Sequence, residues 1–508
     1  MGIFYLNDGT QEAIEQCRQP EPRATIDSQR KAVALMKSSV MGDINLAAVQ
    51  GPPGTGKTSV VETFAYESLP EFINGNKGEI ILYVAPTNYL VYDAYKRILA
   101  RLLQTGFNLT QACEMIRVYG SKIKPYRNLG IEPISFQGSS INATNLSGLM
   151  GQMDGNVRIV LATEFQRISK YLADVRPKRV HYVADESSKT PYFRIFLPLA
   201  EKIARDPSNM YPSSLLVLGD PQQAISVAEE YKNDNVPLLI RLVNGLLRKE
   251  GEEVFRKQWV MLDTTFRLPT PSDAPISFGF YGDKLRGHYS VGERIGIVRD
   301  AIMDNHSKII ETLENAGIQT RTRPASDVLS AIEEGVASSS PIIVLNTESF
   351  AMGDTFDQNR VKLAFLASAI YQIAASQVGY GFSVASIAPY CDIADTVHFR
   401  YRRFGGALKR PRSTTVQSLI GGEASVVVAS LGKEWDMRSK NRNQVDESFT
   451  IYGREPELLN VQFSRHRSQL IVIGNVERLK ELSDQRVQKT VTKMLDMEGK
   501  GTIISRLK

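Results

Sequence analysis

Short apolar runs recur along the first half of the chain, and longer segments with helical spacing separate most of them. The runs cover residues 46–49, 80–85, 158–162, 181–184 and 215–219. The segments between them include residues 91–103 and 193–204. Short buried strands that alternate with helices are typical of a parallel sheet covered by helices on both faces. The pattern therefore predicts an α/β lobe in this half of the chain.

The second half repeats this pattern with apolar runs at residues 341–345, 383–388, 425–431 and 469–474. We therefore predict an α/β fold with two lobes, each built on a parallel sheet. The expected domains are an N-terminal extension over residues 1–26, a first lobe over 27–260 and a second lobe over 261–508. Two segments are typical of small inserted subdomains, a polar stretch at about 118–156 and a helical, charged stretch at about 292–340.

The composition fits a folded protein inside the cell. Of 508 residues, 42% are apolar and 23% are charged, which is ordinary for globular domains. Three scattered cysteines and five histidines form no zinc-binding or disulfide pattern, which favours a reducing compartment. The N-terminus shows no signal-peptide pattern, and the longest apolar stretch, 363–375, is too short to cross a membrane. We therefore expect an intracellular protein without a zinc site and without a membrane partner.

A net charge of +6 permits nucleic acid as a partner without requiring it. Residues 398–412 are more informative, because this stretch holds six Lys and Arg residues and no acidic residue. Three aromatic residues are interleaved with them: Phe399, Tyr401 and Phe404. Basic and aromatic residues together suit a groove that follows a nucleic-acid backbone and stacks bases. A solvated loop explains the same run nearly as well.

The clearest chemical signal is the sequence GPPGTGKT at residues 51–58. It follows an apolar run and precedes a segment, 59–66, that can be helical, as the phosphate-binding motif G-x-x-x-x-G-K-[ST] requires. Glycines let backbone N–H groups turn toward phosphate oxygens, and a helix N-terminus favours the same negative charge. Lys57 is expected to reach the β- and γ-phosphates, and Thr58 to hold Mg²⁺. The sequence therefore predicts a nucleoside triphosphate site formed by Gly51, Pro52, Pro53, Gly54, Thr55, Gly56, Lys57, Thr58 and Ser59.

Two further apolar runs end in polar residues that suit phosphoryl chemistry. The run at 181–184 leads into Asp185 and Glu186. Because a parallel strand delivers its C-terminal residues to the edge where ligands bind, we expect Asp185 at the metal and Glu186 as the base that activates water. An ordinary surface pair of carboxylates is the alternative. The run at 215–219 leads into DPQQ, where a carboxamide could sense the γ-phosphate.

In this order, the motifs resemble those of superfamily 1 helicases, most closely the B branch that contains the nonsense-mediated-decay RNA helicase. The resemblance covers residues 24–475 and implies two RecA-like lobes with ATP and Mg²⁺ bound between them. It implies that Gln29 reads the adenine edge and that Gln223 is the motif III glutamine. It also implies that Phe266 stacks on the base and that Arg267 contacts the γ-phosphate.

The same resemblance continues in the last third of the chain. LLNVQFSRHR at 458–467 is similar to motif VI, which makes Arg465 the second arginine finger. Motif V, normally DSFQGRE, stands here as QSLIGGE. Glu423 of this motif is retained for the nucleotide, whereas Gln417 and Ile420 depart from the family. Contacts to the strand or across the lobes are therefore expected to differ from those of the family.

Other positions resemble the nucleic-acid contacts of the family. They comprise the segment APTN at 85–88, the turn at 162–163 and the segment IAPY at 387–390, which is similar to the family's TPY turn. The implied contacts are Pro86, Thr87, Asn88, Thr163, Pro389, Tyr390 and Thr415. Caps at strand ends would also account for Asn88 and Thr163, and a place in the core would account for Tyr390.

The resemblance implies an ATP-dependent helicase or translocase that moves 5′→3′ along single-stranded nucleic acid and acts at duplex junctions. The alternative is a clamp or remodelling ATPase that nucleic acid stimulates but that separates no strands. The substitutions in motif V and the small size expected for an accessory domain favour this alternative. DNA and RNA both stay open as the bound strand, and the sequence identifies no loading partner.

Overall fold

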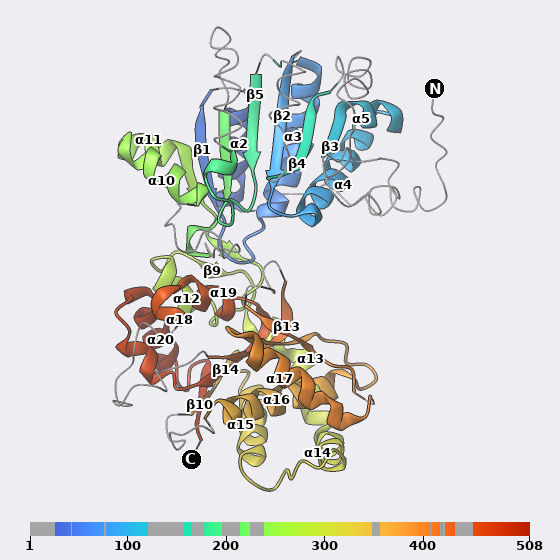
Figure 1. The fold of residues 1–508 in the computed structure, drawn as a ribbon, viewed down its shortest axis with the longest axis vertical. Helices are drawn as coiled ribbons and strands as arrows, with labels where there is room; N and C mark the ends of the chain where they lie inside the picture. Colours follow the sequence, from blue (N-terminus) through green and yellow to red (C-terminus); the bar gives the residue numbers. More distant parts are fainter. Residues whose placement is uncertain are drawn as a thin grey trace. The chain divides into compact units, whose positions relative to one another are not determined.

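The computed structural model describes residues 26–41, 43–75, 78–119, 157–164, 177, 179–195, 214–223, 238–347, 356–406, 408–416, 418, 422–431 and 451–507. Contacts divide the chain into two compact units, Met1–Gly51 with Gly56–Leu262, and Pro52–Thr55 with Asp263–Lys508. Each unit has its own parallel sheet and its own core (Figure 1). The predicted α/β fold with two RecA-like lobes is therefore confirmed.

The first unit is built on a seven-stranded sheet in the order β3-β4-β2-β5-β6-β1-β7. Every neighbouring pair of strands is parallel. Their carboxyl ends therefore lie at one edge of the sheet, which is where open parallel sheets commonly bind ligands. The strands are β1 (Leu46–Gln50), β2 (Glu79–Ala85), β3 (Ile116–Tyr119), β4 (Ile159–Thr163), β5 (Arg179–Ala184), β6 (Ser214–Gly219) and β7 (Trp259–Met261).

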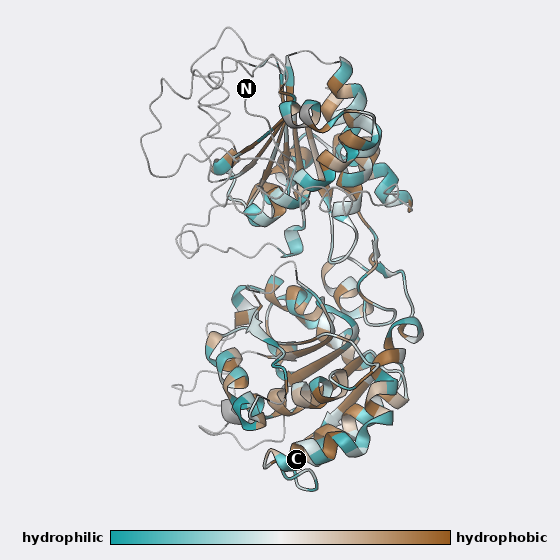
Figure 2. Ribbon diagram, turned by 90° about the vertical axis from the view of Figure 1, so that its right-hand side faces the viewer, coloured by the Kyte–Doolittle hydropathy of each residue, from teal (hydrophilic) through white to brown (hydrophobic). Residues whose placement is uncertain are grey.

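Helices cover both faces of this sheet, because alternate residues of each strand point to opposite sides. In β2, Ile81 and Tyr83 belong to one core and Leu82 and Val84 to another. The first core includes residues of α2 (Asp27–Met41), α3 (Lys57–Gly75), α4 (Asn88–Gln104) and α5 (Leu109–Met115). The second core includes residues of α10 (Leu239–Lys249) and α11 (Glu252–Gln258). Figure 2 shows the strands as mainly hydrophobic, as burial on both faces requires.

The second unit is built on a six-stranded parallel sheet in the order β12-β11-β13-β14-β10-β15. A short parallel pair, β8 (Thr264–Thr265) and β9 (Arg286–Gly287), lies outside this sheet. The strands of the main sheet are β10 (Ile342–Asn346), β11 (Val384–Ala388), β12 (Arg412–Thr415), β13 (Ala424–Ser430), β14 (His466–Gly474) and β15 (Thr502–Arg506).

The helices of this unit are α12 (Ala274–Phe280), α13 (Val291–Asp304), α14 (His306–Asn315), α15 (Ala325–Ala337), α16 (Phe356–Ala375), α17 (Cys391–Arg400), α18 (Ile451–Arg454), α19 (Glu457–Phe463) and α20 (Gln485–Asp496). Helices α13, α14 and α15 occupy the segment that was expected to be a helical insertion. Their residues Val298, Leu313 and Ile332 share one core with α16 and with strands β10 and β13. This segment is therefore part of the core of the second unit.

The apolar pattern predicted the inner strands of both sheets and missed the strands at their edges. The missed strands are β3, β7, β12 and β15, which are the outermost strands of the two sheets. An edge strand has one neighbour and is less enclosed, so it needs no continuous apolar run. The sequence of β12, RSTT, is an example, because none of its residues is fully buried.

Three predicted segments lie largely outside the described residues. They are the N-terminal extension at 1–26 apart from Ile26, the polar stretch at 118–156 apart from its first two residues, and the helix at 193–204 beyond Ile195. Among the helices that the structure describes, none is both long enough and apolar enough to cross a bilayer.

Candidate nucleotide site and arginine cluster

The phosphate loop joins β1 to α3, and α3 begins at Lys57. The Lys57 ammonium donates a hydrogen bond to the carbonyl oxygen of Gly51, 2.9 Å away. A Cβ atom at Gly51 would lie 2.2 Å from Cγ of Lys57, so only glycine leaves room for the lysine in this position. Thr58 is exposed in the first turn of α3, and Ser59 follows it half-buried. The loop thus presents a lysine and a helix N-terminus together, as an anion site requires.

Helix α2 places Gln29 against the same loop. The side chain of Gln29 is buried, and a Cβ atom built on Gly56 would lie 2.6 Å from its Nε2 atom. Gly56 also has a φ of +80°, a backbone conformation that favours glycine. Inside the loop, the hydroxyl of Thr55 donates to the carbonyl oxygen of Pro52 at 2.9 Å. Pro52 and Pro53 are buried. Gln29 is therefore adjacent to the loop, and the contact with adenine that the resemblance implies stays a prediction.

The acidic pair lies at the carboxyl end of β5. The hydroxyl of Tyr83 donates to Oδ2 of Asp185 at 2.6 Å, and the backbone N–H of Glu186 donates to Oδ1 of Asp185 at 2.8 Å. Burial and the charge of Glu186 raise the pKa of Asp185, whereas the Tyr83 bond and the charge of Lys57 lower it. Glu186 has a φ of +48°, which is uncommon for a residue other than glycine. A half-buried carboxylate next to a second negative charge is a site that a cation would stabilise.

The structure brings the acidic pair and the phosphate loop together. Lys57 Nζ lies 3.8 Å from Oε1 of Glu186, and Lys189 Nζ lies 3.3 Å from Oε2. Lys189 was not foreseen from the sequence, although it follows Glu186 by three residues and lies on the same turn. Among the described residues, no group of three or more His, Cys, Asp or Glu side chains could hold a metal ion.

Gln223 belongs to a buried polar network at the carboxyl ends of β1 and β6. Its Nε2 atom donates to Oδ2 of Asp220 at 2.6 Å, and Nε2 of Gln50 donates to Oδ1 at 3.2 Å. Asp220 is almost fully buried. Sequence reasoning assigned Gln223 and missed Asp220 and Gln50. The sequence signal that could have identified Asp220 and Gln50 is their position at the ends of strands next to the phosphate loop.

In the second unit, four residues of the predicted motifs form an arginine cluster. Arg267 donates from Nε to Oε2 of Glu423 at 2.8 Å and from Nη1 to the carbonyl oxygen of Ser464 at 3.1 Å. Arg465 is 3% exposed and donates to the carbonyl oxygen of Gly422 at 3.5 Å. Arg467 also forms an ion pair with Glu423. Arg267, Arg465 and Glu423 thus lie together, although they are far apart in the sequence.

Phe266 is half-buried next to this cluster. Its ring lies 4.8 Å from the ring of His288, centroid to centroid. Its backbone N–H donates to the carbonyl oxygen of Gly54 at 2.9 Å, and its carbonyl oxygen accepts from Arg294 at 3.2 Å. Gly54 belongs to the loop segment that groups with the second unit. One part of the phosphate loop therefore contacts the segment of Phe266 and Arg267.

The predicted nucleic-acid contacts lie at strand ends within each unit. In the first unit, Pro86 follows β2, Thr87 caps the N-terminus of α4 and Asn88 begins that helix. Thr163 ends β4 and pairs with Ala85 of the neighbouring strand, so these residues share one edge. The sequence reasoning missed Tyr89, whose side chain is 74% exposed at the start of α4. An exposed aromatic ring at such an edge is suited to base stacking.

The corresponding residues of the second unit also share an edge. Pro389 and Tyr390 follow β11, and Thr415 ends β12 and pairs with Ala388. Tyr390 is half-buried and packs partly against the core, as the alternative of a place in the core predicted, and its contact with nucleic acid stays a prediction. The hydroxyl of Thr415 lies 2.9 Å from that of Ser418.

The basic stretch at 398–412 differs from the expected stacking groove. Tyr401 and Phe404 are buried in the core of the second unit, where both rings contact Phe365. Only Phe399, 58% exposed, keeps an accessible ring among the three aromatic residues. In this segment, where α17 passes into a 3₁₀ helix, Tyr401 and Phe404 face the core, whereas Phe399 lies at the surface beside Arg402.

Comparisons with known proteins give one family and several structures. A family model described as an AAA domain matches residues 25–145. No curated protein matches the chain. Among solved structures, the chain is similar to the DUF1998 helicase MrfA bound to DNA, at 10% identity and a TM-score of 0.37, over 92% of this chain and 48% of that one. The chain thus spans about half the length of MrfA.

Two further structures align with most of both chains. One is S. cerevisiae Dbp5 bound to RNA and ADP BeF3, at 12% identity and a TM-score of 0.34, over 99% of this chain and 94% of that one. The other is the Hef helicase domain of Pyrococcus furiosus, at 11% identity and a TM-score of 0.32, over 87% of this chain and 94% of that one.

Proposed function

We propose that this chain is an ATP-hydrolysing motor of the superfamily 1 helicase type that moves 5′→3′ along single-stranded nucleic acid. One observation carries the proposal. Lys57 of the phosphate loop lies 3.8 Å from Glu186, so the loop and the acidic pair occupy the same edge of the first sheet. A phosphate-binding lysine beside a metal-binding carboxylate and a second carboxylate is suited to hydrolysis of a nucleoside triphosphate.

Residues of the first unit would each have a distinct role in ATP hydrolysis. Thr58 and Asp185 would hold Mg²⁺, which supplies positive charge next to the phosphates when it is bound. The raised pKa of Asp185 agrees with this role, because a cation would relieve the repulsion between the two carboxylates. Glu186 would accept a proton from the attacking water. Gln29 would contact the base, and Gln223 would respond to the γ-phosphate.

The arginine cluster would supply the remaining charge. Arg267 and Arg465 are held in place by Glu423 and by backbone carbonyl groups, so their guanidinium groups lose little freedom when they meet a phosphate. An arginine finger typically contributes a factor of about 10³–10⁵ in rate. We propose that the two units close on ATP and separate after hydrolysis, and that this cycle advances the strand. Phe266 and Glu423 would help to position the nucleotide.

The strand would lie along the carboxyl ends of the two sheets. Thr87, Asn88 and Thr163 lie at one such edge, and Pro389, Tyr390 and Thr415 at the other. Hydroxyl, amide and backbone groups at strand ends suit contacts with phosphate and sugar, which carry no sequence information. The proposed motor therefore acts on any sequence.

The test uses DNA and RNA duplexes with either a 5′ or a 3′ single-stranded tail, assayed together with ATP turnover. We expect single strands to stimulate ATP hydrolysis, and only the 5′-tailed duplexes to be unwound. Unwinding of 3′-tailed duplexes alone would contradict the direction. Stimulated hydrolysis without duplex opening would identify the clamp or remodelling ATPase instead. A protein that hydrolyses no ATP in the presence of either strand would refute the proposal.

A further inference from the structure

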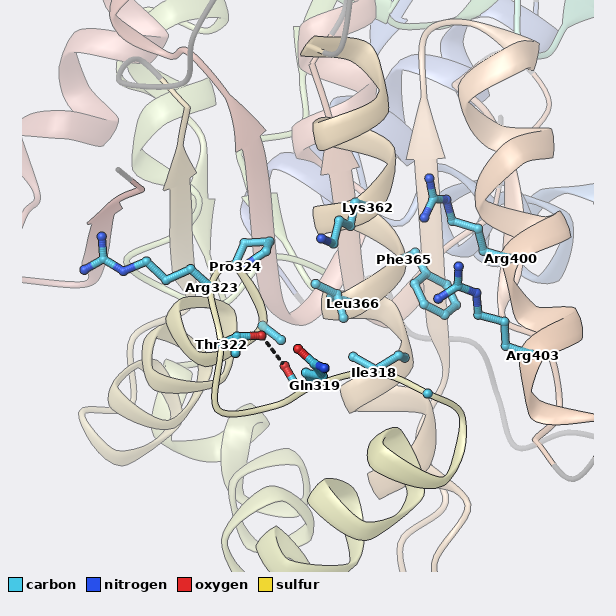
Figure 3. Close-up of a pocket in the computed structure, with 12 residues that line it drawn as sticks. Ile318, Gln319, Thr322, Arg323, Pro324, Lys362, Phe365, Leu366, Arg400 and Arg403 are labelled. Atoms are coloured by element: carbon cyan, nitrogen blue, oxygen red, sulfur yellow. Dashed lines mark hydrogen bonds between the residues drawn. The ribbon is translucent and has the colours of Figure 1, made fainter.

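A pocket with a strong positive charge lies in the second unit, and two of its residues, Arg400 and Arg403, belong to the basic stretch at 398–412. It has a volume of about 200 Å³ and opens where the loop between α14 and α15 meets α16 and the end of α17 (Figure 3). None of the residues that line it belongs to the phosphate loop, the arginine cluster or the strand-end contacts. The pocket is therefore separate from the site described above.

Four basic residues line the pocket, and no acidic residue does. Lys362 comes from α16, Arg400 ends α17, Arg403 follows in the 3₁₀ turn, and Arg323 comes from the loop. Arg323 has a carboxylate nearby, because its Nε lies 3.5 Å from Oδ1 of Asp327. Within the part of the chain that the structure describes, Lys362, Arg400 and Arg403 form no ion pair with a carboxylate.

The basic side chains that line the pocket repel one another. Burial and the charge of Arg403 lower the pKa of Arg400, because the two guanidinium groups repel each other. An anion between the basic side chains would remove this repulsion. Guanidinium groups match the geometry of phosphate oxygens and form paired hydrogen bonds with them. The charge of the pocket is therefore suited to a phosphate group.

The core of the unit holds these side chains in place. Arg400 and Arg403 flank Tyr401, whose ring is buried 5.3 Å from the ring of Phe365. Phe365 itself lines the pocket and comes from the same helix as Lys362. On the opposite side, the hydroxyl of Thr322 donates to the carbonyl oxygen of Gln319 at 3.1 Å, which closes the turn of the loop (Figure 3). One wall of the pocket is thus formed by residues that are anchored in the core of the unit.

The size of the pocket and its surroundings favour a nucleic-acid strand over a free nucleotide. Sites for whole small molecules commonly have volumes of about 300–1,000 Å³, so this pocket suits a phosphate and part of a sugar. Phe399 directly precedes Arg400 in the chain, and its exposed ring lies 4.3 Å below the guanidinium group of Arg402. Lys409 and Arg410 are also exposed on the same segment. An accessible ring among basic residues is typical of a surface that binds a single strand.

We propose that this pocket binds a backbone phosphate of the single strand, with Lys362, Arg400 and Arg403 as the phosphate contacts and Phe399 as a stacking surface for a base. The inference rests on the proposed function. Helix α17 begins directly after Tyr390, and its 10 residues span roughly 15 Å. The pocket would therefore extend the path of the strand from the sheet edge along this helix.

The test compares a double variant, Lys362→Gln with Arg403→Gln, with a control that loses the same charge elsewhere in the unit, Lys284→Gln with Lys489→Gln. All four side chains are exposed, so neither variant disturbs the core. Binding of a fluorescent single-stranded oligonucleotide is measured by anisotropy over a series of salt concentrations. A plot of the logarithm of the binding constant against the logarithm of the salt concentration has a negative slope, and each lost phosphate contact should make it less steep by about 0.7. The slope of the pocket variant should therefore be less steep than that of the wild type by about 1.4. The control should keep the slope of the wild type.

A third variant separates stacking from charge. Phe399→Ala should weaken strand binding without changing the salt slope, because it removes no charge. If the pocket variant binds the strand with the slope of the control, the pocket is not a strand contact and the inference is wrong. It is also wrong if the variant loses only the binding of inorganic tripolyphosphate, which would identify a pocket for a small anion. A wild-type protein that binds no strand would instead contradict the proposed function itself.

Discussion

Lys57 and Glu186 form an ion pair across 3.8 Å, although one belongs to the phosphate loop and the other to the carboxyl end of a strand. The same lysine donates a hydrogen bond to the carbonyl oxygen of Gly51. Glu186 has a second cationic partner in Lys189, at 3.3 Å. In the proposed mechanism Lys57 would turn to a phosphate, and Glu186 would then keep Lys189 as a positive neighbour. The proposed base would therefore stay paired while Lys57 binds the nucleotide.

Replacement of Lys57 by alanine should weaken nucleotide binding. Hydrogen bonds to charged groups contribute about 1.5–3 kcal/mol, so we expect the affinity for ATP to fall about 10- to 150-fold. Binding of a fluorescent ATP analogue measures this loss. Lys249→Ala serves as the control, because this exposed lysine lies at the end of α10 and contacts no part of the loop. Equal affinities of the two variants would show that Lys57 does not hold the phosphates.

Replacement of Glu186 by glutamine should stop hydrolysis and leave binding intact. A general base contributes about 10²–10⁴ in rate, and glutamine keeps the shape of the side chain but cannot accept the proton. The single-turnover rate of ATP hydrolysis measures the loss, and the affinity for the ATP analogue is measured alongside it. Glu250→Gln, an exposed position after α10, is the matched control. A Glu186→Gln protein with the wild-type rate would remove Glu186 from the mechanism.

Replacement of either Arg267 or Arg465 should lower turnover by about 10³-fold or more, with a smaller effect on nucleotide binding. Since Arg465 is almost fully buried, Arg465→Lys is preferred to alanine, and Arg267→Lys gives a matched pair. Lysine keeps the charge and loses the planar fork of donors. The measurements are kcat and the thermal unfolding midpoint. Arg299→Lys, at an exposed arginine on α13, is the control. If the variants at Arg267 and Arg465 have a lower unfolding midpoint but an unchanged kcat, the two arginines have a structural role.

Because the pKa of His466 is lowered in the folded protein, the free energy of unfolding of the second unit should decrease in mild acid. Burial, and then the charge of Arg267, lower the pKa of His466 from 6.5 to about 3, and its Nε2 lies 2.8 Å from the hydroxyl of Ser272. Between these two pKa values the unfolded chain binds a proton that the folded chain does not, so stability falls as the pH falls from 6.5 toward 3. The slope approaches about 1.4 kcal/mol per pH unit for one such group.

Urea unfolding of the wild type and of His466→Gln at several pH values tests this expectation. The wild type should lose more stability than the variant between neutral pH and about pH 4.5, whereas the difference between them should be constant above about pH 7.5. Other buried groups, including His181, affect both proteins equally. Parallel curves over the whole range would show that the pKa of His466 is the same in the folded and the unfolded protein.

The edge strands and the contacts of individual side chains were the parts that the sequence did not predict. The inner strands carry continuous apolar runs because neighbours and helices enclose them, and the edge strands β3, β7, β12 and β15 lack this signal. Tyr401 and Phe404 were expected in a stacking groove because they alternate with arginines. Both are core residues, and only Phe399 is accessible. An alternating pattern alone does not say which side of a turn faces the core.

The amino-acid sequence by itself determined the α/β organisation, the phosphate loop and the chemical identity of Lys57, Asp185 and Glu186. These features depend on local spacing, which a chain displays before it folds. Only the tertiary structure decided which side chains meet, such as Tyr83 with Asp185 or Arg267 with Glu423, separated by 102 and 156 positions. Contacts over such separations depend on which faces of the strands and helices are buried against each other. Which faces are buried together is determined by the packing of the complete chain, and local spacing in the sequence does not specify it.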